Sequence, residues 1–156
     1  MNMRDLCVKY VQSPIGLIEI AGTADAITDL NFVDKRQKAD SHSNAVLYEA
    51  AEQLREYLNG VRKEFTVPLE LKGTEFQKKV WQALLTVGYG NKVTYKYIAE
   101  VVGNPKAVRA VGAANGKNPI SIIVPCHRII GSDGSLTGYG GGIWRKEWLL
   151  RHEGCL

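Results

Sequence analysis

The spacing of apolar residues changes near residue 73, and this change most constrains how the chain can fold. Before it, short β-rich runs are separated by turn signals, which is typical of an antiparallel meander. After it, apolar residues recur every three or four positions, as in amphipathic helices. The sequence therefore predicts an α+β protein with a supporting domain over 1–72 and a mainly helical domain over 73–156.

Four elements are expected in the first domain. They are strands over 7–11, 15–21 and 26–33 and a helix over 45–58, which Asn59-Gly60 stops. Residues 65–68 are expected to add a last strand, followed by a linker over 69–73. No chemical site assembles in residues 1–60, so the domain is assigned a supporting role.

Helices are expected to dominate the second domain. Thr74 is expected to cap a helix that ends at Leu85, and Thr94 is expected to cap a helix over 95–102. Asn104-Pro105 is expected to begin a third helix over 106–115. A glycine-containing turn between two helices is a helix-turn-helix signature, although many helical hairpins share it. The first of these helices is expected to bury Phe76, Val80, Trp81, Leu84 and Leu85. A final helix over 143–152 is expected to turn Trp144, Trp148 and Leu149 toward the core.

Charge is divided unevenly between the two domains. Residues 1–72 contain nine Lys/Arg and eleven Asp/Glu, a net charge of −2, whereas residues 73–156 contain eleven and five, a net charge of +6. A basic excess indicates either a polyanion partner, nucleic acid first, or a solvated basic face. The third helix combines small residues with Lys106 and Arg109, so it can approach either a protein core or a nucleic-acid groove, and the basic excess favours DNA.

Residues 120–130 carry the strongest chemical signal. Residues 120–124 are predicted to form a short buried strand, which Pro125 ends directly before Cys126. A reactive cysteine needs a nearby base or cation, and His127 and Arg128 can supply both. An inert buried cysteine is the alternative, but the flanking Pro, His and Arg argue against it. Glu147 is either a surface charge or the acid of a Cys-His-acid array, and spacing alone leaves both open.

The remaining composition excludes several classes of protein. Cys7, Cys126 and Cys155 are widely separated and lack metal or redox spacing, so reduced thiols and an intracellular, cytoplasmic protein are expected (nuclear in a eukaryote). No apolar run approaches the roughly 20 residues of a membrane span, and no signal peptide is seen. The run Gly138–Gly142 fails the dinucleotide fingerprint because Ile143 replaces its third glycine. We interpret that run as a wall that lets a planar ligand approach the backbone.

Several ordered motifs closely resemble the O6-alkylguanine-DNA alkyltransferases, also called methylated-DNA–protein-cysteine methyltransferases. These motifs are Pro125-Cys126-His127-Arg128, Gly103-Asn104-Pro105, Arg109-Ala110-Val111-Gly112, Asn118-Pro119, Lys146-Glu147-Trp148-Leu149-Leu150 and His152-Glu153-Gly154. The resemblance is dense from Phe76 to Gly154, whereas residues 1–72 are similar only in length and pattern. It implies an N-terminal RNase-H-like antiparallel sheet with a helix, followed by a winged helix-turn-helix-like domain.

The resemblance also implies a reaction. Cys126 would take an alkyl group from guanine O6 in double-stranded DNA, or from O4-alkylthymine, keep it as a thioether, and be spent after one turnover. His127, polarised by Glu147, would draw the thiol proton through a water, and Asn118 would hold the active-site turn. Tyr95 would protonate the guanine, which is rotated out of the stack from the minor groove, and Arg109 would fill the vacated space.

Other positions follow from the same resemblance. The implied DNA contacts are Tyr95, Lys96, Asn104, Arg109, Ala110, Ala114, Arg128 and Ser132, and the implied substrate pocket is Tyr139, Gly140 and Gly141. A monomer without cofactor or membrane contact is expected. Some relatives hold zinc in the N-terminal domain, but only Cys7 and His42 are present there, so no metal is expected. Gly140 stands where some members have serine, which implies a roomier pocket for bulkier alkyl groups.

Three alternative functions compete with this one. A non-enzymatic sensor of alkylated DNA on the same scaffold would replace the nucleophilic cysteine, but Cys126 is intact. A regulator that senses alkylation would carry a further domain, for which we expect no room. A Cys-His-Glu hydrolase of unrelated fold would leave the basic half of the chain unexplained.

Overall fold

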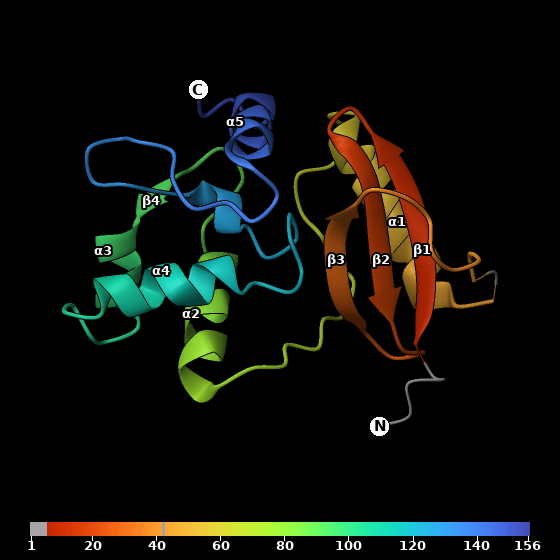
Figure 1. Ribbon diagram of the computed structural model, residues 1–156, viewed down its shortest axis with the longest axis horizontal. Coiled ribbons are helices and arrows are strands. Elements are labelled where there is room, and N and C mark those ends of the chain that lie inside the picture. Colours follow the sequence, from red (N-terminus) through yellow and green to blue (C-terminus); the bar gives the residue numbers. More distant parts are fainter. Residues whose placement is uncertain (1–5, 42) are drawn as a thin grey trace. The chain divides into compact units, whose positions relative to one another are not determined.

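The computed structural model describes residues 6–41 and 43–156, and the chain divides into two compact units, 1–71 and 72–156. The division lies one residue before the boundary expected from the sequence. The first unit is a three-stranded sheet with one helix, and the second is a cluster of helices with two very short strands (Figure 1). None of the helices in the described part of the chain is long and apolar enough to cross a membrane.

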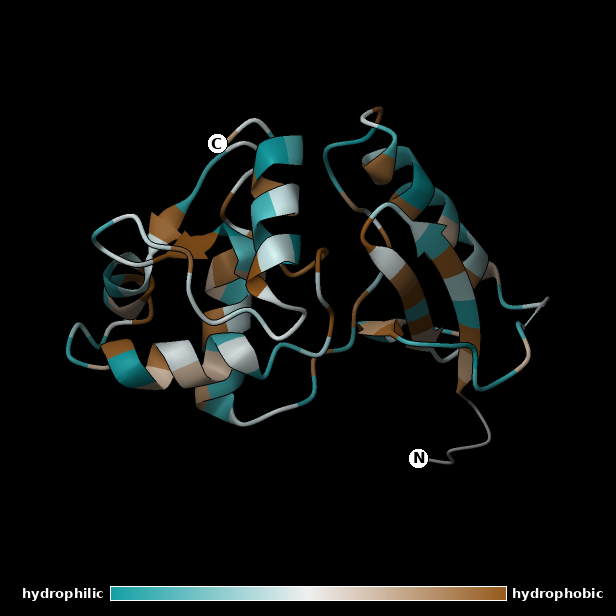
Figure 2. Cartoon of the chain, turned by 45° about the horizontal axis from the view of Figure 1, so that its top comes forward, coloured by the Kyte–Doolittle hydropathy of each residue, from teal (hydrophilic) through white to brown (hydrophobic). Residues whose placement is uncertain are grey.

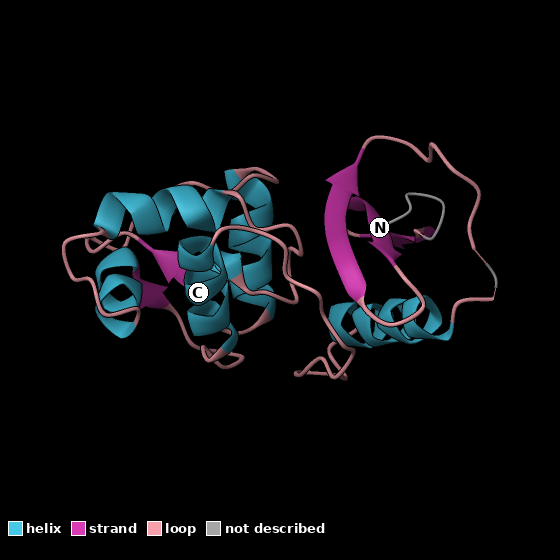
Figure 3. Cartoon of the chain, turned by 90° about the horizontal axis from the view of Figure 1, so that it is seen from below, coloured by secondary structure: helices cyan, strands magenta, loops and turns pink. Residues whose placement is uncertain are grey.

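The first unit is an antiparallel meander covered by a helix. Its strands are β1 (Cys7–Ser13), β2 (Gly16–Gly22) and β3 (Ile27–Val33), in the spatial order β1-β2-β3. Helix α1 (Ala45–Leu58) lies along this sheet (Figure 3), and Asn44 caps it by accepting a hydrogen bond from Leu47 N. The three expected strands and the expected helix are confirmed.

Apolar side chains occupy both faces of this sheet. On each face, the register places apolar residues of neighbouring strands beside one another. Val8, Tyr10 and Ala21 form a small cluster on one face. Ile18, Ile20 and Leu30, which are completely buried, lie on the opposite face. Polar residues alternate with these apolar ones along the strands (Figure 2), the period expected of β-structure.

Residues 65–68 do not form the expected strand. The chain touches the sheet through Leu69, where Ile27 N donates to Pro68 O and Glu70 N donates to Ile27 O, both at 2.9 Å. Pro68 has no N–H to donate, so it cannot extend a ladder of hydrogen bonds. The expected strand is therefore reduced to an isolated bridge.

The second unit is mainly helical. Its helices are α2 (Glu75–Leu85), α3 (Tyr95–Val101), α4 (Val108–Gly116) and α5 (Ile143–His152), and its strands β4 (Val93–Thr94) and β5 (Ile129–Ile130) pair in parallel. Thr74 and Gln77 form a capping box at α2, and Thr94 caps α3, as the sequence predicts. Buried Trp81 ties α2 to α4, because its indole N–H donates to Ala114 O at 2.9 Å.

Two details of these helices differ from expectation. Helix α4 begins at Val108 rather than Lys106, and Asn104 does not cap it: Ala107 N donates to Asn104 O at 2.9 Å, which closes a turn over 104–107. Asn followed by Pro favours the first two positions of such a turn. In α2, Leu85 is exposed and Phe76 is only half-buried, while Ala83 is buried instead.

Candidate active site

The segment before Cys126 is a pair of tight turns, not the predicted buried strand. Ile123 N donates to Ser121 O at 2.8 Å, and Cys126 N donates to Val124 O at 2.8 Å, so Ile122 and Pro125 each lie at the centre of a three-residue turn. Ile122 has a φ of +71°, which is strained for a β-branched residue, and it is 1% exposed. Apolar content predicted burial correctly here, but the backbone curls and places Cys126 at the start of a short 3₁₀ helix, η2 (Cys126–Arg128).

Asn118 holds this strained segment closed. Its side-chain amide donates to Val124 O at 2.8 Å, and its side-chain oxygen accepts from Ile120 N at 3.0 Å. Asn115 adds a longer bond of 3.4 Å from its amide to Cys126 O. The two asparagines therefore position the backbone on both sides of the thiol, and the geometry matches the holding role implied for Asn118.

Cys126 is buried, with 5% of its surface exposed. Burial raises the pKa of the thiol to about 11, although a hydrogen bond with Asn118 and the charge of Lys146 act in the opposite direction. In the resting protein the sulfur is therefore a neutral thiol at neutral pH. It needs a proton acceptor to become a nucleophile.

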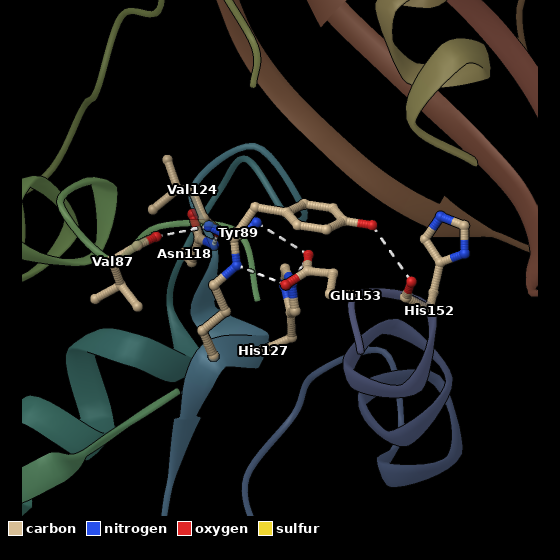
Figure 4. Close-up of polar contacts among 8 residues, drawn as sticks. Val87, Tyr89, Asn118, Val124, His127, His152 and Glu153 are labelled. Carbon is tan, nitrogen blue, oxygen red and sulfur yellow. Dashed lines mark hydrogen bonds and ion pairs between the residues drawn. The ribbon is translucent and has the colours of Figure 1, made fainter. Parts of the chain in front are cut away.

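His127 is completely buried and contacts a carboxylate, but that carboxylate belongs to Glu153. His127 Nε2 and Glu153 Oε2 are 2.8 Å apart (Figure 4). Burial alone would raise the pKa of Glu153, but hydrogen bonds and charges from His127 and Arg128 outweigh it and hold the pKa at about 2. Since an ionised carboxylate only accepts hydrogen bonds, Nε2 must carry the proton. His127 Nδ1 then keeps its lone pair, and no described residue bonds to it.

The prediction that Glu147 polarises His127 is wrong. Glu147 accepts a hydrogen bond from Arg151 Nε at 3.0 Å on the outer side of α5. The helix turns Lys146, Leu149 and Leu150 inward, while Trp144 is 56% exposed and Trp148 stacks on His152. Glu153 follows Lys146 by seven residues, two helical turns, and so comes back to the buried face.

Arg128 is also buried, which contradicts its predicted contact with DNA. Its Nε donates to Glu153 Oε1 at 2.8 Å, and its Nη2 donates to Glu153 Oε2 at 3.0 Å. Its Nη1 donates to Val87 O at 2.6 Å. All three donor nitrogens of the guanidinium are thus bound inside the unit, and only 7% of the residue is exposed.

The loop over 137–142 is held by two side chains that meet at one carbonyl. Lys146 Nζ donates to Thr137 O at 2.7 Å, and Tyr95 OH donates to the same oxygen at 3.2 Å. Lys146 is completely buried, and burial lowers its pKa to about 8. The loop carries the pocket residues expected from the sequence: Tyr139 is buried, and Gly140 is exposed with open space around its Cα. Tyr139 lies near enough to Cys126 that thiolate formation would raise the tyrosine pKa further, beyond the effect of burial.

The residues expected to contact DNA divide by exposure. Lys96, Asn104, Arg109, Ala110 and Ser132 are exposed, and Tyr95 is half-buried at the start of α3. Ala114 is 2% exposed and packs under Trp81, so the prediction that it contacts DNA is wrong. It lies on the inner face of α4, whereas Arg109, Ala110 and Ala113 lie on the outer face.

Metal ligands do not cluster in the described residues. Within 6–41 and 43–156, no three His, Cys, Asp or Glu side chains converge on one point. His42, the other metal-ligating side chain of the N-terminal domain besides Cys7, lies outside the described residues.

Sequence reasoning missed four contributors to the site: Glu153, Lys146, Asn115 and the carbonyl of Thr137. Glu153 was predictable, because Leu149 and Leu150 at three and four residues after Lys146 define one helical face that also includes position 153. A lysine at the start of that face hid the pattern, since lysine is rarely buried.

Comparisons with known proteins cover both units. Residues 6–71 match the family model of the 6-O-methylguanine DNA methyltransferase ribonuclease-like domain, and residues 75–155 match that of the 6-O-methylguanine DNA methyltransferase DNA binding domain. The methylated-DNA–protein-cysteine methyltransferase of Mycobacterium leprae is 50% identical over 149 residues, 93% of this chain and 90% of the relative. That of Methanosarcina acetivorans is 49% identical over 148 residues, 92% of this chain and 95% of the relative.

Solved structures agree with these matches. The crystal structure of Mycobacterium tuberculosis O6-methylguanine methyltransferase superposes with a TM-score of 0.87 at 45% identity, covering 95% of this chain and 92% of that chain. The Mycobacterium tuberculosis OGT structure in complex with DNA gives 0.86 at 48% identity, covering 94% and 91%. The α+β fold and the resemblance drawn from the sequence are confirmed. Because both units match and the similarity extends along nearly the whole chain, this protein belongs to the 6-O-methylguanine DNA methyltransferase family.

Proposed function

We propose that this protein repairs DNA by moving an alkyl group from O6 of guanine to the sulfur of Cys126, once per molecule. The observation that carries the proposal is the buried Cys126-His127 pair, in which Glu153 orients the imidazole and Nδ1 has no hydrogen-bond partner among the described residues. Relatives that are about half identical are named methylated-DNA–protein-cysteine methyltransferases, which supports the same chemistry.

The reaction is a single displacement. His127 Nδ1 accepts the thiol proton, directly or through a water, and the thiolate attacks the alkyl carbon in line with the carbon–O6 bond. The sulfur–carbon bond forms as the carbon–oxygen bond breaks, and the electron pair leaves on guanine, which takes a proton in return. A thioether has no good leaving group, so Cys126 stays alkylated and the protein turns over once.

The substrate base must leave the helical stack to react. Cys126 is 5% exposed, so its sulfur cannot reach a base inside a duplex, and extrusion costs only a few kcal/mol. Tyr95 already donates a hydrogen bond at the edge of the pocket loop, where it can donate to an extruded guanine instead. Arg109, exposed near the start of α4, is the side chain that would occupy the space left in the stack.

The surface that would meet DNA is the outer side of α3 and α4. Small Ala110 and Ala113 allow a close approach to the minor groove, and Lys96, Asn104 and Ser132 are exposed for backbone contacts. The basic excess of residues 73–156 favours the same partner. We assign the N-terminal unit a supporting role and expect the protein to act as a monomer on double-stranded DNA.

Intact-protein mass spectrometry tests transfer directly. After incubation with a duplex that contains one O6-methylguanine, the wild type should gain roughly one methylene, saturating at one per protein, and Cys126→Ala should gain none. Damage-selective binding without a gain in mass would instead indicate a sensor. A gain that survives in Cys126→Ala would place the nucleophile elsewhere.

DNA contacts need their own test with a matched control. Arg109→Ala should weaken binding to both damaged and intact duplex and reduce the salt slope by about one. Arg151→Ala removes another exposed arginine, one that pairs with Glu147, so it should leave the slope unchanged. Equal effects of the two substitutions would show that α4 is not the contact surface.

A further inference from the structure

Arg128 was predicted to contact DNA, yet it is buried and donates hydrogen bonds to Glu153, the carboxylate that also contacts His127. The two oxygens of Glu153 take part in three hydrogen bonds with the side chains of Arg128 and His127. Oε1 accepts from Arg128 Nε at 2.8 Å, while Oε2 accepts from Arg128 Nη2 at 3.0 Å and lies 2.8 Å from His127 Nε2 (Figure 4). A buried guanidinium in a two-point grip of this kind is a costly arrangement that a plain structural contact does not require.

We propose that Arg128 is a positioning residue for thiol activation: by gripping both oxygens of Glu153, it keeps His127 neutral, with Nε2–H on Glu153 and Nδ1 open to the proton of Cys126. The inference rests on the proposed transfer to Cys126. It adds a residue that does not touch the reacting atoms and acts only through Glu153.

The hydrogen bonds from Arg128 to both oxygens of Glu153 have two effects on His127. The first is orientation, because the fork fixes the plane of the carboxylate and so the direction from which Oε2, the oxygen that Arg128 shares with His127, accepts Nε2–H. The guanidinium is also held by groups other than Glu153 and His127. Arg128 Nη1 donates to Val87 O at 2.6 Å, and the guanidinium lies 5.9 Å from the centre of the Tyr89 ring.

The second effect is control of charge. A buried carboxylate beside an imidazole favours the protonated imidazolium, which has no lone pair at Nδ1 and cannot accept a proton. Three charged groups face His127: Glu153 raises its pKa, and Arg128 and Lys146 lower it. Burial is the largest influence, and the pKa lies below its ordinary value. Of the two cations, Arg128 is the one bonded to the same carboxylate, whereas Lys146 donates to Thr137 O.

The sign of the expected effect follows from these charges. Transfer requires the neutral form of His127, so its rate rises with pH through the pKa of that histidine. Loss of the Arg128 charge leaves Glu153 uncompensated beside the imidazole, which raises the pKa of His127. The midpoint of the pH–rate profile should therefore move upward, by about one pH unit, with the rate restored at higher pH.

Arg128→Met, Arg128→Lys and the control Arg151→Met form the test set. Single-turnover transfer to the full-length protein is followed between about pH 6 and pH 9, together with duplex affinity at several salt concentrations. NMR chemical shifts of the His127 imidazole nitrogens report its tautomer and titration without any substrate. Arg151→Met applies the same chemical change to an exposed arginine that pairs with Glu147.

The expected result is an upward shift of the midpoint for Arg128→Met, with a rate about tenfold lower below the midpoint. Arg128→Lys should give a smaller shift because it keeps the charge but not the fork. Duplex affinity and its salt slope should not change, and Arg151→Met should match the wild type throughout. In the NMR titration, His127 should gain its second proton at a higher pH in the Arg128 variants.

Several outcomes would overturn the inference. One is a rate that falls by the same factor at every pH, which indicates a purely structural role. Another is a salt slope that decreases by about one, which indicates a phosphate contact. If Arg128→Met does not fold, Arg128→Lys decides between these results. If the wild type takes up no alkyl group, the proposed function fails, and the titration of His127 still tests Arg128.

Discussion

The two units of this protein are stabilised in different ways. In the N-terminal unit, backbone ladders join β1, β2 and β3, and apolar side chains pack between the sheet and α1. In the segment 118–142 of the second unit, only β5 and the single turn of η2 are regular structure. There, polar side chains bind backbone groups: Asn118 and Arg128 do so from within the segment, and Lys146 reaches the carbonyl of Thr137 from α5.

This difference has a consequence for substitutions. A β-ladder consists of many equivalent backbone hydrogen bonds, so replacing one side chain leaves most of them intact and lowers the free energy of unfolding only slightly. A buried polar cluster leaves unpaired charges when one member is removed, which costs much more. The effects of substitution on chemistry should therefore concentrate in the segment 118–142 and in the face of α5 that packs on it.

The largest effect is expected for Glu153→Gln. It removes the negative charge between His127 and Arg128, so the imidazole loses its ionised acceptor and the guanidinium stays buried without a counter-charge. We expect transfer to fall about a hundredfold and the free energy of unfolding to fall by about 3–5 kcal/mol. Single-turnover rates and urea denaturation measure the two effects.

Glu147→Gln is the matched control on the same helix. It breaks one exposed pair with Arg151, worth about 0.3–0.5 kcal/mol, and should leave transfer unchanged. If both substitutions slowed transfer equally, the assignment of Glu153 would fail.

Acid should weaken the C-terminal unit next most strongly. The pKa of Glu153 is lowered from 4.5 to about 2, so its contribution is complete above the unfolded value and is lost as pH falls from about 4.5 toward 2. The lost contribution is on the order of 3 kcal/mol. His127 acts in the same direction, since its pKa is lowered and its neutral form favours the folded state.

Urea denaturation at a series of acidic pH values measures this loss. The wild type should lose stability over that window more steeply than Glu153→Gln, which has no carboxyl group to protonate at this position. Parallel curves for the two proteins would contradict the assignment.

Two asparagines, one that closes a turn and one that caps a helix, allow a direct comparison of the units. Asn118→Ala releases Val124 O and Ile120 N, and we expect a loss of about 1–3 kcal/mol together with slower transfer, because the backbone that carries Cys126 loosens. Asn44→Ala removes the cap of α1 and should cost about 1 kcal/mol.

Transfer per folded molecule separates the two variants. Asn44→Ala should retain the wild-type rate, because the residues assigned to the site all belong to the second unit. A slower rate in Asn44→Ala would show that the N-terminal unit does more than support the fold.

The smallest effect is expected for Gly140→Ser. A Cβ at Gly140 meets no atom within 4 Å, and its backbone does not lie in the left-handed region, so serine fits without strain. We expect unchanged stability, unchanged methyl transfer and slower transfer of bulky alkyl groups, because the new side chain narrows the pocket. Competition between methyl and benzyl adducts measures the ratio, and equal transfer of bulky groups by both proteins would remove Gly140 as the cause of a roomier pocket.

Local signals in the sequence were sufficient for most of the secondary structure. Thr74 and Thr94 cap their helices as expected, and β1, β2 and β3 begin and end within two residues of prediction, because capping and alternation depend on near neighbours. Prediction failed for 120–124, where apolar residues suggested a strand. Burial there comes from the turn that Asn118 closes, and apolar content cannot distinguish a buried turn from a buried strand.

The sequence by itself determined the reactive pair, since Cys126 and His127 are adjacent in an apolar run, and it determined the family through its ordered motifs. Only the tertiary structure decided which acid completes the pair and where Arg128 points. The rotation of α5 about its axis depends on which side chains its neighbours bury, so a buried Lys146 moves Glu147 outward and brings Glu153 to His127. Arg128 follows for the same reason, because a charge inside a protein lies where its counter-charge is.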